Sequence, residues 1–474
     1  MNRYLKILIF LLLIKSAFVI WGIQANVIEL GPDEAQYWTW SQKLDWGYYS
    51  KPPGVAWQIW LGTQLLGNTE LGVRILSVVI SFLLALSVYF LARVCRLKAN
   101  TAFWAGMVMA FSPLGIMASF LATTDGGMIL FWTLACIAMA SALSRGVAPN
   151  YYLLGALIML GALFKWPIYL FWVFVLLAMC IYSTLRSRHV LCGMAISLLG
   201  CLPSVLWNSS HKWVTFQHVL STIKGGSSPL QQGNFVDFLG AQMSLLSPIL
   251  FVLLVLAFVS LLRNSSKVWP SVLFCGAMSL LLLTIYSTMA LFQKMQGNWS
   301  LFAYPSGIVL LGWFACERGK RGKPWLIGGV ILSVVLSISV LSLPTVQARG
   351  LLPIPYKVNP FKHNLGWTKL KEELALLGYD PEQHFLFGDK YQMSSLLSFY
   401  SPGQKRTYFL NLHGTRQNQF SYWPSMADEQ QRKTGFFVLA ENSPRLEREF
   451  PERIKQYQIQ LKDYFEEVHF EGLR

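Results

Sequence analysis

The chain of 474 residues is apolar and basic, with 54% hydrophobic residues, 13% charged residues and a formal net charge of +16. Soluble proteins carry about 25% charged residues, so this composition excludes an ordinary soluble protein and favours one that spans a membrane. Residues 1–343 hold 22 Lys+Arg against 8 Asp+Glu, whereas residues 344–474 hold 17 against 15. The basic excess therefore belongs to the apolar part, where basic loops beside membrane spans explain it without a nucleic acid partner.

Eleven apolar stretches are candidates for membrane-spanning helices, which need about 20 residues each. The two short stretches on either side of Lys165-Trp166-Pro167 also fit one broken helix. An uncleaved first span is preferred to a signal peptide, because Lys15 interrupts its apolar run and no small-residue cleavage site follows. The predicted spans are 5–24, 71–93, 101–120, 126–144, 151–165, 167–183, 189–206, 243–262, 268–290, 299–316 and 324–343.

The charged loop residues orient these spans, because cytoplasmic loops are enriched in Lys and Arg. With the N-terminus in the cytoplasm, Glu317 is the one cytoplasmic acid, and the other seven acids before residue 344 fall at or near the outer side. The segment after the last span is then outside. Fourteen basic residues fall on the cytoplasmic side: Arg3, Lys6, Arg93, Arg96, Lys98, Arg145, Arg186, Arg188, Arg263, Lys267, Arg318, Lys320, Arg321 and Lys323.

The sequence gives little sign of a metal or disulfide site. Its seven cysteines are isolated, with no CxxC or Cys/His cluster. His211 and His218 are seven residues apart and would share a face of a helix, but no acid is ordered between them. We therefore predict no metal ligands, and leave a divalent cation open as a cofactor.

The first outer segment, residues 25–70, is more polar than a connector needs. Pro32 before Asp33 and Glu34 indicates a helix start, since carboxylates are favoured in the first turn. The following aromatic residues suit a short helix in the headgroup layer, which Lys51-Pro52-Pro53 ends. A capped interfacial helix with solvated charges is the alternative. We predict a reactive site here, with Asp33 as its first candidate.

The turn before the fourth span carries Asp125, after Thr123 and Thr124. A carboxylate at the end of a span is costly unless it is capped, paired or functional. The alternative to a functional role is that Thr124 or Asp125 merely caps the next helix.

A long polar outer loop covers residues 207–243. It contains Trp207-Asn208, the two histidines above, Lys224 and Gly225-Gly226. Its length and glycines suit a loop that covers a substrate, and an ordinary surface loop is the alternative.

Four cations at the outer side are candidates for holding a lipid phosphate: Lys51, Arg74, Lys165 and Lys294. Asn298 and Trp299 follow the last of them closely. The alternative for each cation is a side chain that extends along apolar surface to reach water.

Taken in order, these motifs resemble the membrane glycosyltransferases of the protein O-mannosyltransferase superfamily, which have the GT-C fold. The bacterial branch that includes lipid A aminoarabinose transferase is the most similar, and the resemblance covers most of residues 1–345. The ordered set is Asp33-Glu34-Ala35-x-Tyr37-Trp38, Trp46-Gly47-Tyr48-Tyr49-Ser50-Lys51-Pro52-Pro53, Thr123-Thr124-Asp125, Lys165-Trp166-Pro167, Trp207-Asn208 and Gly297-Asn298-Trp299.

The resemblance implies transfer of a sugar from a polyprenyl phosphate, with inversion, to an acceptor on the far side of a bacterial inner membrane. Asp33 and Asp125 match the family's two outer aspartates. Asp33 is the expected base, Asp125 orients the acceptor or shares that role, and Glu34 is either structural or in support. Lys51 matches the lysine that contacts the carrier phosphate. Tyr49, Arg74, Lys165, Lys294 and Asn298 are further candidates for substrate binding.

One position departs from the aminoarabinose enzymes, which have an acid immediately before that lysine. Ser50 stands there in this chain. This difference weakens a metal site and weakens aminoarabinose as the sugar. The expected acceptor is lipid A or another glycolipid, with a protein hydroxyl as the alternative.

Residues 345–474 predict a small α/β domain on the outer side, after a transmembrane domain of residues 1–344. Helices are expected at 367–377 and 391–400. Strands are expected at 384–387, 407–410, 435–440 and 464–469. Structural packing is the favoured role, with acceptor binding or closure over the site as alternatives.

A lipid flippase or transporter is the rival from another functional class. It predicts ionisable residues inside the spans and paired broken helices in repeats. Lys15 is the one obvious charge within a span, and no repeat is evident. The acids gather in one outer layer instead, which favours chemistry at the membrane surface.

Overall fold

Long apolar helices dominate the computed structural model, which describes residues 2–223, 233–318, 322–348, 351, 361, 364–411, 417–431, 433–438 and 465–468. The chain forms two compact units. The first, called the helical unit, consists of Met1–Trp21, Trp46–Gln58 and Arg74–Leu341. The second, called the mixed unit, consists of Gly22–Asp45, Ile59–Val73 and Ser342–Arg474.

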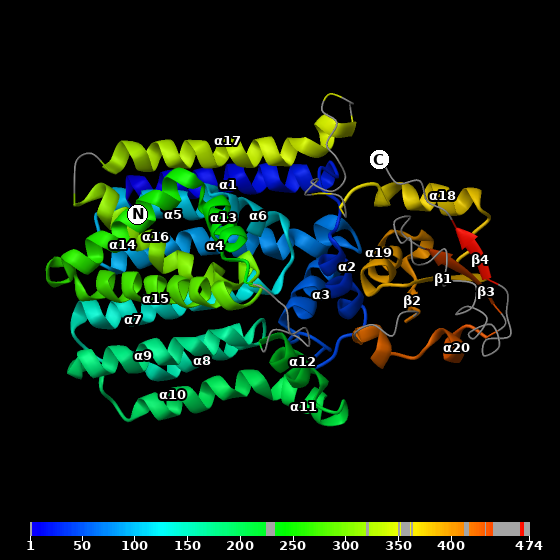
Figure 1. The fold of residues 1–474 in the computed structure, drawn as a ribbon, viewed down its shortest axis with the longest axis horizontal. Coiled ribbons are helices and arrows are strands. Elements are labelled where there is room, and N and C mark those ends of the chain that lie inside the picture. The colour runs from blue at the N-terminus through cyan, green and yellow to red at the C-terminus, as the bar shows by residue number, and fades with distance from the viewer. Residues whose placement is uncertain are drawn as a thin grey trace. The chain divides into compact units, whose positions relative to one another are not determined.

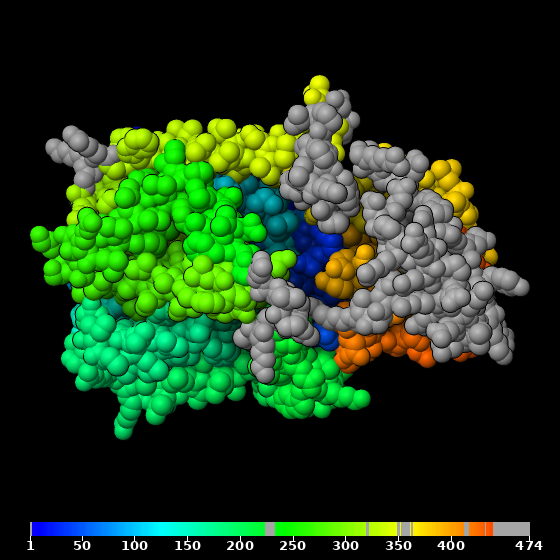
Figure 2. Space-filling model, viewed as in Figure 1, coloured from blue at the N-terminus to red at the C-terminus, as the bar shows by residue number. Residues whose placement is uncertain are grey.

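The long helices of the helical unit run side by side along nearly one direction, while shorter ones such as α13 cross them (Figure 1). Apolar side chains fill the spaces between them, and the face drawn in Figure 2 shows the teal helices closed against the green ones. In chain order the main helices, which lie wholly or mostly in this unit, are α1 (Arg3–Gln24), α4 (Glu70–Val94), α5 (Ala99–Phe111), α6 (Pro113–Phe120), α7 (Thr124–Arg145), α8 (Tyr151–Ala162), η1 (Trp166–Tyr169), α9 (Leu170–Ile181), α10 (His189–Leu198), α11 (Leu202–Ser210), α12 (Val214–Ile223), α13 (Phe235–Leu246), α14 (Pro248–Arg263), α15 (Pro270–Phe292), η5 (Gly297–Ala303), α16 (Tyr304–Cys316) and α17 (Gly322–Ala348).

The predicted count of about eleven spans is not confirmed. In the described part of the chain, seven helices are long and apolar enough to cross a membrane, or nine if each of two bent pairs is one span. The two stretches around Lys165 form the short helices Tyr151–Ala162 and Trp166–Ile181. Neither reaches the length of about 20 residues that a straight crossing needs, because the helix stops on both sides of Lys165.

Two of the predicted spans are bent. The helix pair α5 and α6 turns by 54°, and α13 and α14 turn by 104°. Ser247, between α13 and α14, has a φ of 90°, a backbone conformation that a residue other than glycine rarely adopts. The predicted straight span over 243–262 is therefore wrong at its start, where α13 runs in another direction.

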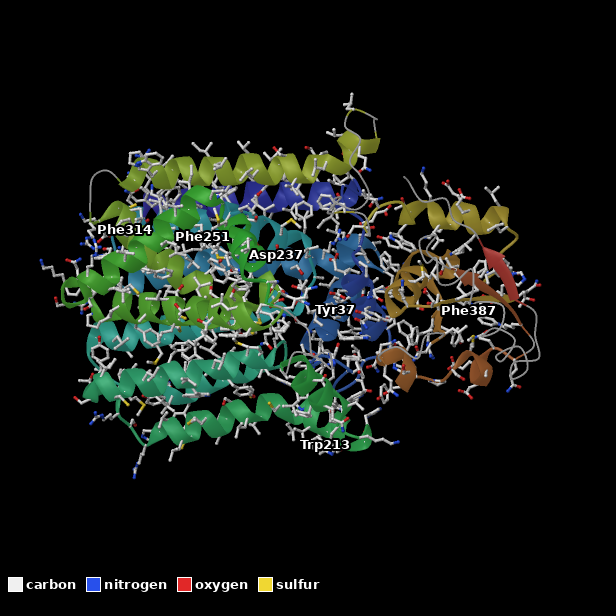
Figure 3. The ribbon with its side chains drawn as sticks, in the orientation of Figure 1. Tyr37, Trp213, Asp237, Phe251, Phe314 and Phe387 are labelled. Carbon is white, nitrogen blue, oxygen red and sulfur yellow. The ribbon has the colours of Figure 1, made fainter. Side chains whose placement is uncertain are left out.

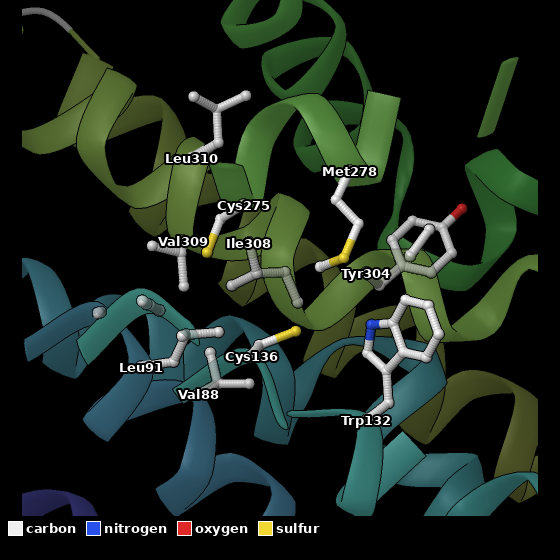
Figure 4. Close-up of a cluster of buried hydrophobic side chains, with 14 of the residues drawn as sticks. Val88, Leu91, Trp132, Cys136, Cys275, Met278, Tyr304, Ile308, Val309 and Leu310 are labelled. Atoms are coloured by element: carbon white, nitrogen blue, oxygen red, sulfur yellow. The ribbon is translucent and has the colours of Figure 1, made fainter. Parts of the chain in front are cut away.

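The centre of the helical unit is an apolar cluster in which Trp132 of α7 is fully buried. Its ring packs edge-on against Phe302, with centroids 4.7 Å apart, and against Phe171 at 5.0 Å. Figure 4 shows side chains of α4, α7, α15 and α16 converging there, Cys136 and Met278 among them. Burial of large side chains stabilises this packing by about 1.5–3 kcal/mol each.

Loops predicted to face the cytoplasm contact one another at one end of the helical unit. The backbone N–H of Lys98 donates to the Glu317 carboxylate at 2.7 Å, and the Arg96 guanidinium lies 5.3 Å from the centroid of the Trp269 ring. Figure 3 shows Phe314 near this end and Trp213 at the opposite end. The predicted residues Lys320 and Arg321 lie outside the described part of the chain.

The mixed unit holds a small sheet, as predicted. The four described strands are parallel and lie in the order β2-β1-β3-β4. They are β1 (His384–Gly388), β2 (Tyr408–Phe409), β3 (Thr434–Val438) and β4 (Phe465–Val468). A parallel pair needs a crossover, and α19 (Tyr391–Tyr400) supplies it between β1 and β2. The predicted ends at 439–440, 464 and 469 lie outside the described residues.

Helices from both ends of the sequence complete the mixed unit. The predicted helix after Pro32 is α2 (Pro32–Ser41). Helix α3 (Gly54–Leu66) follows it in the chain, and its residues from Ile59 onward belong to this unit. The predicted helix over 367–377 is η7 (Trp367–Lys369) followed by α18 (Leu370–Leu376). The shorter η9 (Gln419–Tyr422) and α20 (Met426–Glu429) lie before β3. Helix α2 packs on α19, with the rings of Trp38 and Phe399 edge to face at 5.0 Å.

Candidate active site

Asp125 is the centre of a polar cluster in the helical unit. It lies in the first turn of α7, where the helix dipole favours a carboxylate, and it is 8% exposed. Its Oδ1 is 2.7 Å from Lys165 Nζ, and its Oδ2 accepts a hydrogen bond of 3.2 Å from Asn298 Nδ2. Thr123, not Thr124 or Asp125, is the N-cap of α7. The alternative that Asp125 merely caps its helix is therefore wrong.

Lys165 lies at the junction between α8 and η1. Its backbone N–H donates to Gly161 at 3.1 Å, which ends α8, and Pro167 then begins the next helical turn. The side chain does not simply extend to water, since its ammonium is paired with Asp125 and is mostly buried. The break between two short helices thus serves to place a cation beside the acid.

Asn298 is held in place by a buried amide that sequence reasoning missed. Gln242 of α13 donates from Nε2 to the carbonyl of Gly297 at 3.1 Å. Its Oε1 accepts hydrogen bonds from Ser300 at 2.9 Å and from Tyr304 at 2.6 Å. A polar side chain beside an apolar run is costly without such partners, and this cost is the signal that could have identified Gln242. The bend before α14 puts this side chain against η5.

The loop that carries Lys51 is anchored next to Lys165. The N–H of Gly54 donates to the carbonyl of Leu163 at 2.7 Å. A Cβ at Gly54 would lie 2.6 Å from that carbonyl oxygen, so a larger residue could not approach as closely. The hydrogen bond between Gly54 and Leu163 therefore joins the two segments close to both cations. Lys51 is three residues before Gly54, and Lys165 is two residues after Leu163.

Helices α11 and α12 support the other side of this loop. Asn208 is fully buried and accepts the N–H of Thr215 at 3.0 Å. The Thr215 hydroxyl in turn donates to the carbonyl of Tyr48 at 3.0 Å, and the N–H of Tyr48 donates to Lys51 at 3.2 Å. Thr215 is a second residue that the sequence does not single out, although the predicted motifs include its neighbours Trp207 and Asn208.

Aromatic stacking adds to this support. The ring of Tyr49 stacks on His218 with centroids 5.2 Å apart, and Trp166 stacks on Phe216 at 4.8 Å. His211 does not share a helix face with His218, because α12 begins only at Val214. It stacks on Trp207 at 3.8 Å instead.

The remaining predicted cations, Arg74 and Lys294, differ in burial. Arg74 is fully buried in the second turn of α4. Lys294 is exposed between α15 and η5, beside Met295, whose backbone N–H and carbonyl are both held by Asn234 at 2.8 and 2.9 Å. Among the described residues, no group of three or more His, Cys, Asp or Glu could hold a metal ion. The predicted loop residues Lys224, Gly225 and Gly226 lie outside the described part of the chain.

Asp33 and Glu34 belong to the mixed unit, in the first turn of α2. Glu34 is 2% exposed, and its Oε2 accepts the N–H of Gly31 at 3.1 Å, so it caps the helix. Asp33 is exposed to solvent. The structure therefore assigns a structural contact to Glu34 and leaves Asp33 at the surface of its unit.

The two comparisons with known sequences both find glycosyltransferases. Residues 50–207 match a family model described as dolichyl-phosphate-mannose-protein mannosyltransferase. The lipid A galacturonosyltransferase RgtD of Rhizobium johnstonii is 27% identical over 374 residues, which are 77% of this chain and 77% of that protein.

Comparisons with solved structures establish the fold. ArnT from Cupriavidus metallidurans, bound to undecaprenyl phosphate, superposes with a TM-score of 0.62 at 14% identity, over 94% of this chain and 91% of that one. The oligosaccharyltransferase of Archaeoglobus fulgidus in its apo form has a TM-score of 0.53 at 11% identity, over 97% of this chain and 68% of that one.

Proposed function

We propose that this chain, a membrane glycosyltransferase of the protein O-mannosyltransferase superfamily with the GT-C fold, transfers a sugar from a polyprenyl phosphate to lipid A. The similarity to a lipid A galacturonosyltransferase favours lipid A as acceptor and a uronic acid as the first sugar to test. The fold shared with a structure that binds undecaprenyl phosphate favours a polyprenyl carrier.

The proposed location is the bacterial inner membrane, with the reaction on its outer face. The N-terminus is then cytoplasmic, and residues 345–474 lie outside as a domain that follows a transmembrane part of residues 1–344. This orientation places the basic end of the helical unit in the cytoplasm, as the distribution of Lys and Arg favours. The acids Asp33 and Asp125 then share the outer side.

The observation that carries the proposal is the paired Asp125 and Lys165 beside the anchored loop of Lys51. The leaving group of the reaction is a lipid phosphate, which gains negative charge as its bond to the sugar breaks. Fixed cations at this point stabilise the transition state, because they need no reorganisation. We assign this task to Lys51 and Lys165, with Arg74, Lys294 and Tyr49 in support of donor binding.

The proposed reaction is a single displacement with inversion. The acceptor oxygen bonds to the anomeric carbon while the bond between that carbon and the phosphate oxygen breaks. Asp33 takes the proton of the acceptor hydroxyl, and polyprenyl phosphate leaves with the electron pair. Asp125 is not assigned as the base, because both of its carboxylate oxygens already accept a hydrogen bond. It holds Lys165 and Asn298 in place, and together with Asn298 it orients the substrates.

The test uses purified chain in lipid nanodiscs with lipid A and a panel of polyprenyl phosphate sugars: galacturonic acid, aminoarabinose and mannose. We expect a mass increase of lipid A with at least one donor. Transfer to a peptide hydroxyl but not to lipid A would show that the acceptor is a protein and not lipid A. Movement of the donor across vesicles, with no transfer from any donor, would identify a flippase instead.

A further inference from the structure

Two acids of the first outer segment, Glu29 and Glu70, are buried within the mixed unit although neither belongs to the proposed reaction. They are 4% and 8% exposed. A buried carboxylate is costly unless hydrogen bonds or cations compensate for its lost hydration. Both obtain hydrogen bonds from residues more than 300 positions later in the chain.

Glu29 accepts donors from the start of the helical segment η7–α18. The N–H of Trp367 donates to Oε2 at 2.6 Å, while the N–H and the hydroxyl of Thr368 donate to Oε1 at 3.0 and 2.6 Å. The backbones join as well, since the N–H of Glu29 donates to Asn364 at 3.1 Å. Hydrogen bonds to a charged acceptor are stronger than those between neutral groups, so these contacts hold Glu29 firmly.

Tyr400, the last residue of α19, links Glu70 to Leu30, the residue that follows Glu29. Its hydroxyl accepts the N–H of Leu30 at 2.6 Å and donates to Oε1 of Glu70. Gln404 adds a hydrogen bond of 3.1 Å to the carbonyl of Asn68, whose side chain accepts the indole N–H of Trp38 at 3.0 Å. The C-terminal segment, here residues 364–404, is therefore bonded directly to the residues immediately before α2 and, through Asn68, to the middle of α2.

We infer that Glu29, Glu70 and Tyr400 are positioning residues, which fix α2, and with it Asp33, to the C-terminal segment. Helix α2 has 10 residues, too few to hold its own position in water. The bonds at Leu30 and Glu29 lie one and two residues before Gly31, the N-cap of α2. The C-terminal segment thus sets where the carboxylate of Asp33 is held. This consequence for the reaction rests on the proposed function.

The test compares Tyr400→Phe and Thr368→Val with the matched control Tyr422→Phe, which removes a hydroxyl bond to Gln417 elsewhere in the mixed unit. In hydrogen exchange, we expect the amides of α2 to exchange about tenfold faster in the first two variants and unchanged in the control. This readout does not depend on activity. Unchanged α2 exchange in both folded variants would overturn the inference.

The rate of sugar transfer tests whether the position of α2 matters for the reaction. We expect kcat to fall about three- to tenfold in Tyr400→Phe while the KM for the donor stays within about twofold, because the base is displaced and the carrier site is intact. A role in packing alone predicts unchanged kcat in the fraction that folds, which would contradict the inference. No transfer by the wild type, together with faster α2 exchange, would reject the proposed function and leave the positioning of α2 standing.

Discussion

Asp125 and Asp33 both lie in the first turn of a helix, but one is in the helical unit and the other in the mixed unit, and their surroundings differ. Asp125 is buried and accepts hydrogen bonds from Lys165 and Asn298. Asp33 is exposed, beside a buried Glu34 that caps the helix. The first arrangement keeps a charge fixed. The second leaves a carboxylate where a substrate from the aqueous side can reach it, and this difference is the basis for giving the two acids separate roles.

The largest expected effect is on Asp33→Asn, which tests whether the exposed acid is the base. Removing a general base lowers a rate by about 10²–10⁴-fold, and we expect kcat to fall in that range while the protein stays folded. Transfer is measured by mass spectrometry of lipid A. The control is Asp237→Asn, an exposed acid in the first turn of α13 (Figure 3), which should retain wild-type rates.

The second prediction concerns stability in the helical unit. Lys165→Met leaves the Asp125 carboxylate without its cation, and breaking a buried pair costs about 3–5 kcal/mol. We expect a lower thermal unfolding midpoint, with partial recovery in the double variant Lys165→Met/Asp125→Leu. The exposed Lys294→Met serves as control. Equal midpoints for Lys165→Met and Lys294→Met would show that the pair is not buried in the folded protein.

The role of Asp33 follows from the sequence, whereas the prediction for Lys165 depends on contacts that the sequence could not supply. The apolar runs locate almost every long helix, because about 20 apolar residues leave few other structures possible in a membrane. Asp125, Lys165 and Asn298 are also each recognisable, as polar residues at span ends. Their pairing is not, since 40 and 173 positions separate Asp125 from its two partners and only the packed helices bring them together.

The structure differs from the sequence-based predictions at particular helices and contacts, each for its own physical reason. A hydropathy window does not detect where a helix stops, so α8 and α9 count as spans in the sequence although each is short. The bend between α13 and α14 depends on the positive φ of Ser247. The sequence Ser247-Pro248 does not by itself require that conformation, so the bend was not predictable. Glu29 and Glu70 are visible in the sequence only as outer acids, and their partners Thr368 and Tyr400 lie in another part of the chain.

A smaller effect is expected for Thr215→Val, which removes the hydroxyl bonded to Tyr48 without changing the shape of the side chain. The loop of Lys51 then loses one support, and the freed carbonyl costs about 1–3 kcal/mol in a buried site. We expect the KM for the donor to rise about three- to tenfold with kcat almost unchanged. Thr222→Val, whose hydroxyl bonds within α12, is the matched control. Equal KM values in both variants would remove Thr215 from the support of the donor site.

The smallest effect is expected for Lys294→Gln. The side chain is exposed, so its attraction for a phosphate is screened by water and salt. We expect about a twofold rise in donor KM at low salt. At about 0.5 M NaCl the Debye length is shorter than at low salt, so we expect no difference from the wild type. A large effect that persists in salt would instead place Lys294 in direct contact with the donor.

The most direct measurement is a single turnover that follows both products at once, in nanodiscs that hold the donor accepted by the wild type together with lipid A. We expect one polyprenyl phosphate to appear for each sugar attached to lipid A, at one rate in the wild type, and neither product to appear on that timescale with Asp33→Asn. Release of polyprenyl phosphate without modified lipid A, or equal rates in the two proteins, would contradict the proposed single displacement with Asp33 as base.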